Sequence, residues 1–157
     1  MTGMRAICFI TLCAGWLGCG SSSTSMPSVT GRWNVVFTSA VAQQGQQGEQ
    51  TTFTVSLMQR GTGLTGSLTS LVQPSSCFPA SPPLSGSALS GQVTREGEAI
   101  ANFHATIQLP GAGTTTNPLN LVGDLGTTAG GGMYTLESGV PGGCHFPAGT
   151  FSMNLLP

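Results

Sequence analysis

The chain contains no lysine and very little charge of either sign. Its 157 residues include 4 arginines and 5 acidic residues, so only 6% of them are charged. Nucleic-acid binding requires clustered cationic side chains that displace counterions, and anionic membrane surfaces attract polybasic segments. The sequence has neither kind of cluster, which excludes nucleic acid as a partner and excludes a polybasic patch for membrane binding. Solubility must therefore come from uncharged polar side chains and from the backbone.

The sequence also lacks the motifs of several catalytic and metal sites. No Gly-x-Ser-x-Gly elbow is present, since Leu84–Ala88 lacks the first glycine, and Gly130–Gly132 is not followed by the lysine of a phosphate loop. The histidines are His104 and His145, and they do not have zinc-finger spacing. We expect no enzyme activity, no metal and no cofactor. An enzyme stays open only if scattered carboxylates converge in a cleft.

The first residues have the layout of an export signal. Arg5 precedes an almost wholly apolar stretch, Ala6–Leu17, which is too short to span a bilayer comfortably. Leu17-Gly18-Cys19 closes the stretch and resembles a bacterial lipobox, in which the cysteine is lipidated and becomes the N-terminus. The resemblance implies a signal peptide over residues 1–18 and a lipid on Cys19. It also implies export to the bacterial cell envelope, and to the outer membrane if the cell is Gram-negative.

Composition divides the remaining chain into a tether and one domain. Residues 19–30 are small and polar, which indicates a flexible tether between the lipid and the domain. Residues 31–157 have the length of a single domain with a core of its own.

Apolar and polar residues alternate with a period of two in several segments of this domain. The clearest segments are Trp33–Thr38, Thr52–Leu57, Ala99–Leu109 and Phe151–Leu156. Such alternation predicts strands with one buried and one solvated face, as in antiparallel sheets. We therefore predict an all-β fold, an up-and-down meander of about eight strands that forms a closed or partly open small barrel. A β-sandwich is the alternative, because it produces the same pattern.

Glycine-containing segments between these runs predict the turns. Arg60–Gly63 and Arg95–Glu98 are expected to be hairpin turns, and Thr127–Gly132 a further connection. Glycine also recurs within the runs, for example in Leu64-Thr65-Gly66-Ser67-Leu68 and Leu89-Ser90-Gly91-Gln92-Val93. Glycine inside a strand indicates a sharp bend or a close backbone approach, both of which barrels need.

The start of the first run resembles that of the calycins, the lipocalin and avidin group. Gly31-Arg32-Trp33 matches their Gly-x-Trp opening, and Leu64-Thr65-Gly66-Ser67-Leu68 is similar to a stretch of the avidin side. The resemblance implies a barrel, and a small apolar ligand within it. It does not imply biotin, because Trp33 is the only tryptophan after the signal. The residues that would line such a site are Trp33, Phe37, Phe53, Leu57, Phe103 and Ile107. The alternative is that they are plain core, since small barrels are often filled by their own side chains.

The cysteines of the exported chain are Cys19, Cys77 and Cys144. A structural disulfide between Cys77 and Cys144 is the default in an exported protein, and a lipid on Cys19 then leaves no free thiol. A redox pair, or a metal site that includes His145, is the alternative for the two later cysteines. An ordinary cleaved signal with a free Cys19 is the alternative to lipidation.

Two functions follow from these expectations. In the first, a lipid-anchored barrel binds a small apolar ligand in its interior. In the second, the protein is a structural or interaction lipoprotein with a filled core, and its loops at Gln43–Gln50 and Thr114–Asn117 contact envelope proteins. A cavity of about 300 Å³ or more favours the first function, and a filled core favours the second.

Overall fold

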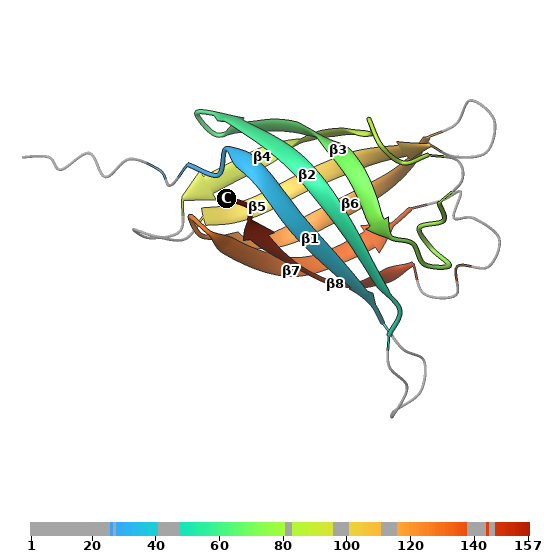
Figure 1. The fold of residues 1–157 in the computed structure, drawn as a ribbon. Coiled ribbons are helices and arrows are strands. Elements are labelled where there is room, and N and C mark those ends of the chain that lie inside the picture. Colours follow the sequence, from blue (N-terminus) through green and yellow to red (C-terminus); the bar gives the residue numbers. More distant parts are fainter. Residues whose placement is uncertain are drawn as a thin grey trace, which may run out of the picture.

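The computed structural model describes residues 26, 28–40, 48–80, 83–95, 101–110, 116–137, 144 and 147–157. The predicted signal peptide and most of the predicted tether lie outside these residues. Eight strands make up the fold (Figure 1). They are β1 (Gly31–Ser39), β2 (Gln50–Arg60), β3 (Gly63–Gln73), β4 (Ala88–Arg95), β5 (Ala101–Pro110), β6 (Thr116–Leu125), β7 (Ala129–Leu136) and β8 (Ala148–Leu155).

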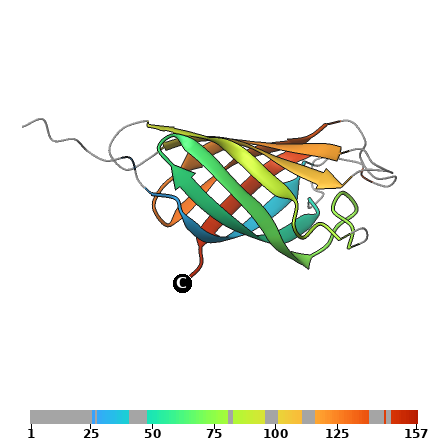
Figure 2. The same cartoon turned by 90° about the horizontal axis from the view of Figure 1, so that it is seen from above.

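The strands form a closed barrel in which each pairs with the next along the chain. Every pair is antiparallel, and β1 closes the ring by pairing with β8, for example at Trp33 and Leu155. Figure 2 shows the barrel from a second side, with the strands inclined to its long axis. The predicted all-β meander of eight strands is confirmed, and the fold is a closed barrel rather than a sandwich.

Alternation along the strands separates the core from the surface. In β5, Ala101, Phe103, Ala105, Ile107 and Leu109 are buried, whereas the intervening side chains are exposed or half-buried. The same rule applies around the barrel, because successive side chains of a strand point to opposite faces of the sheet. The interior is a continuous cluster of apolar side chains to which all eight strands contribute.

The predicted turn at Arg60–Gly63 is confirmed. Gly61 and Thr62 join β2 to β3, and Gly61 has a φ of +61°, a conformation that residues with a Cβ rarely adopt. The predicted turn at Arg95–Glu98 falls largely outside the described residues. The register between β4 and β5, in which Arg95 lies opposite Ala101, is that of an antiparallel pair.

The prediction that Thr127–Gly132 forms a connection is wrong. The connection is shorter, and the glycine run belongs to β7. The reason is a close approach between strands: Gly132 lies opposite Gly123 of β6, and a Cβ on Gly123 would come within 2.7 Å of the Gly132 Cα. Glycine is required here by the backbone of the neighbouring strand, not by a turn.

Candidate functional site

The barrel interior is the site that the calycin resemblance implies, and all six predicted lining residues lie in it. Each is at most 3% exposed: Trp33, Phe37, Phe53, Leu57, Phe103 and Ile107. The void among them is small. Phe37, Leu57, Phe103 and Ile107 help to line an interior cavity of about 10 Å³. That is about the volume needed to hold one water molecule. The six side chains therefore belong to an apolar core that leaves little free space among them.

The chain before β1 covers one end of the barrel. Val29 is fully buried, and its carbonyl oxygen accepts a hydrogen bond from the indole Nε1 of Trp33 at 2.9 Å. The backbone amide of Val29 donates to the side-chain oxygen of Gln59 in β2, also at 2.9 Å. The last residues of the predicted tether are thus packed, so the folded unit begins before Gly31.

The connection between β3 and β4 covers the other end. Phe78 of this connection is 1% exposed. Its ring centroid lies 5.5 Å from that of Phe37, 5.2 Å from that of Phe53 and 6.0 Å from that of Tyr134. These aromatic rings belong to β1, β2 and β7, so Phe78 closes the end by packing between strands from different parts of the barrel. We call residues 74–80 and 83–87 the cap.

Cys77 and Cys144 lie at disulfide-bonding distance, with their Cα atoms 4.3 Å apart. The predicted pairing is therefore confirmed in its geometry. Cys77 belongs to the cap, and Cys144 belongs to the connection between β7 and β8. These two connections leave the ring of strands at opposite positions, because β3–β4 and β7–β8 are four strands apart in a barrel of eight. The cystine thus joins two connections that come from opposite sides of the ring, and Cys77 directly precedes Phe78.

Tyr134 and Asn117 are two of the buried polar side chains near this capped end. Burial, with a smaller contribution from the negative charge of Glu49, raises the pKa of Tyr134 to about 12. The side-chain oxygen of Asn117, at the start of β6, is buried and has no hydrogen-bond partner in the described structure. Leaving such an acceptor unpaired costs free energy, and we find no compensating contact.

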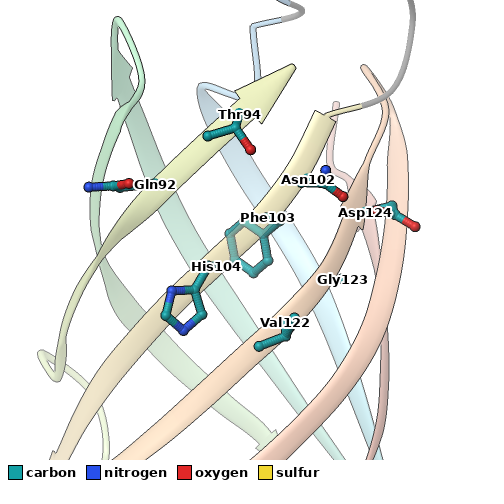
Figure 3. Close-up of a pocket in the computed structure, with 8 residues that line it drawn as sticks. All are labelled: Gln92, Thr94, Asn102, Phe103, His104, Val122, Gly123 and Asp124. Atoms are coloured by element: carbon teal, nitrogen blue, oxygen red, sulfur yellow. The ribbon is translucent and has the colours of Figure 1, made fainter. Parts of the chain in front are cut away.

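A groove of about 280 Å³ lies on the outer surface of β4, β5 and β6 (Figure 3). It is lined by the side chains of polar residues that point outward and by the backbone between them. The lining residues are Gln92, Thr94, Asn102, Phe103, His104, Val122, Gly123 and Asp124. Cross-strand pairing brings them together: Gln92 lies opposite His104, and Asn102 lies between Thr94 and Asp124.

Sequence reasoning places His104 on the polar phase of the run Ala99–Leu109, and both His104 and Asp124 are exposed. It did not bring them into one groove, and it did not select Gln92, Thr94 or Asn102. Their only sequence signal is alternation, which places a residue on a face but does not identify its cross-strand neighbours.

The other predicted contact points are only partly visible. Residues 43–47 and 114–115 of the predicted contact loops lie outside the described structure, as does His145. The described carboxylates are dispersed: Glu49 precedes β2, Glu137 follows β7 and Asp124 lies in β6. Among the described residues, no group of three or more His, Cys, Asp or Glu side chains is placed to hold a metal ion.

No protein-family model, curated protein or solved structure matches this chain. Within the described part of the chain, there is no helix with the length and apolar character needed to cross a membrane.

Proposed function

We propose that this protein is a lipid-anchored, non-enzymatic domain of the bacterial cell envelope that makes its contacts through its outer surface. The observation that carries the proposal is the filled interior. The cavity that described side chains line within the barrel has a volume of about 10 Å³, whereas small-molecule sites generally have at least about 300 Å³. Of the two functions expected from the sequence, a filled core favours the interaction lipoprotein over the carrier of an apolar ligand.

The closed ends of the barrel support the same proposal. Val29 packs at one end, and Phe78 packs at the other beside the cystine. A ligand of the interior would have to displace Phe78 from its contacts with Phe37 and Phe53. This proposal therefore takes the barrel architecture from the calycin resemblance, but it does not include a ligand in the interior.

The anchor in this proposal is the lipid on Cys19. With Cys77 and Cys144 paired, an unmodified Cys19 would be the single unpaired thiol of the exported chain, and acylation removes it. Each buried methylene of an acyl chain contributes about 0.8 kcal/mol, so two or three chains hold a domain stably on a membrane.

Metabolic labelling with an alkynyl fatty acid tests the anchor. The full chain should incorporate the label and enter the detergent phase of a phase separation. The Cys19→Ser variant should do neither, and the Cys13→Ser variant should behave as the parent chain does. An unlabelled full chain, or a labelled Cys19→Ser variant, would overturn the anchor.

A further inference from the structure

We propose that the outer groove on β4, β5 and β6 binds a neutral carbohydrate. This inference rests on the proposed function, because it assigns a ligand class to the outer surface rather than to the interior. Its starting point is the set of five polar side chains, from three strands, that surround one hollow (Figure 3): Gln92, Thr94, Asn102, His104 and Asp124.

The hydrogen-bonding groups of these five side chains are uncommitted. In the described structure none of them donates to or accepts from another side chain or the backbone. The adjoining part of the same face is different. There the Thr106 hydroxyl donates to the Asn120 side-chain oxygen at 2.8 Å, and the Asn120 amide donates to Glu137 at 2.6 Å. The groove thus leaves its donors and acceptors for a ligand, whereas the neighbouring polar residues satisfy one another.

The charges and donor types of the groove select the ligand class. Among the described residues, no lysine or arginine lines it, so no described cation offsets the charge of an anionic ligand. His104 and Asp124 are the two potential metal ligands among its described lining residues, fewer than the three or four that protein metal sites generally supply. A neutral polyol satisfies the groups that are present. Carboxamides both donate and accept, and the Asp124 carboxylate accepts from hydroxyl groups.

The groove also offers apolar surface. The Val122 side chain is 56% exposed at the edge of the groove, whereas the Phe103 side chain belongs to the barrel interior and is 2% exposed. Met133 of β7 lies opposite Val122 and is 66% exposed. A sugar ring has the matching character, because its C–H face is apolar and its hydroxyl groups project from the edge. The volume of about 280 Å³ is near the lower limit for small-molecule sites, which indicates a ligand of a few sugar units at most.

An array of neutral and acidic glycans tests the inference. The sample is the full chain, expressed for export and then purified in detergent. The parent protein should bind neutral glycans, and the affinity for the best of them is then measured by titration. Asn102→Ala and Gln92→Ala should each weaken that affinity about tenfold, because each removes a carboxamide that bonds the ligand. Asn154→Ala is the matched control, since Asn154 is an exposed asparagine of β8 outside the groove. It should bind as the parent does.

The outcomes separate this inference from the function on which it rests. Binding to no neutral glycan overturns the inference, and so does binding that Asn102→Ala and Gln92→Ala leave unchanged or binding that acidic glycans dominate. None of these results changes the filled interior or the anchor. Circular dichroism of the variants distinguishes a lost contact from a lost fold, because these exposed side chains contribute nothing to the core.

Discussion

The ring of Phe78 lies edge-on to the ring of Phe53, with 5.2 Å between their centroids and 87° between their planes. Aromatic pairs favour this geometry, because the positive edge of one ring meets the negative face of the other. Phe53 belongs to a strand and Phe78 to the cap, so the contact makes the cap part of the core. The barrel is closed by its own connection, and the cap should contribute to stability as strand residues do.

Phe78→Ala should therefore lower the free energy of unfolding by about 3–5 kcal/mol, the usual cost of truncating a buried phenylalanine. Urea denaturation followed by the fluorescence of Trp33 measures the change. Met58→Ala is the control and should cost less than about 0.5 kcal/mol, since the Met58 side chain is 50% exposed. Equal effects of the two substitutions would show that the cap is not packed.

Loss of the cystine should destabilise the fold. The double variant Cys77→Ser, Cys144→Ser should lose about 2–5 kcal/mol of stability, because the cystine restricts the unfolded chain over a sequence separation of 67 residues. Adding a reductant should lower the unfolding midpoint of the parent protein and leave that of the double variant unchanged. A parent protein insensitive to reductant under unfolding conditions would contradict the pairing.

Gly123→Ala should be destabilising by about 1–3 kcal/mol, because its Cβ would lie within 2.7 Å of the Gly132 Cα and force two strands apart. Gly63→Ala is the matched control, since the nearest atom to its Cβ is the Arg60 carbonyl oxygen at 3.4 Å. Thermal unfolding of both variants makes the comparison. A tolerated Gly123→Ala together with a damaging Gly63→Ala would refute the close approach of β6 and β7.

Tyr134 should ionise only near pH 12, two units above the ordinary tyrosine pKa. Its pKa is raised in the folded state, so between about pH 10 and pH 12 the unfolded chain loses this proton and the folded chain keeps it. The contribution of Tyr134 to the free energy of unfolding is therefore fully present below pH 10. It is lost as the pH rises through this window, which lowers the free energy of unfolding by on the order of 2–3 kcal/mol. Absorbance at the tyrosinate band, recorded against pH, measures the titration directly, because Tyr134 is the single tyrosine of the chain. A midpoint near pH 10 would show that its hydroxyl is solvated.

Much of the fold follows from the alternation of apolar and polar residues. Where this pattern predicts the wrong structure, the reason is physical. In β5, the pattern from Ala101 to Leu109 predicts which side chains are buried. The start of β7 could not be predicted, because glycines carry no side chain with which to mark a face. Only the register that sets Gly132 opposite Gly123 shows why they belong in a strand.

The two candidate sites, the interior and the outer groove, also differ in how far the sequence predicts them. The interior residues were predictable from hydrophobicity, but alternation does not show whether they enclose a cavity. It also does not show that Phe78, from a connection of irregular structure, packs among them. The groove depends on which outward residues meet across β4, β5 and β6. Alternation does not determine that register, so Asn102 and Gln92 carried no signal of their own.

Native mass spectrometry of the segment Ser21–Pro157, exported to an oxidising periplasm, tests most directly the central claim that the barrel is filled by its own side chains. The predicted result is one species with the sequence mass less two hydrogens, owing to the cystine, and with no adduct under gentle ionisation. The contrary result is an added mass that survives gentle ionisation and is lost on activation. If the Asn102→Ala variant carries the same added mass, the interior holds a ligand. That result would contradict the account.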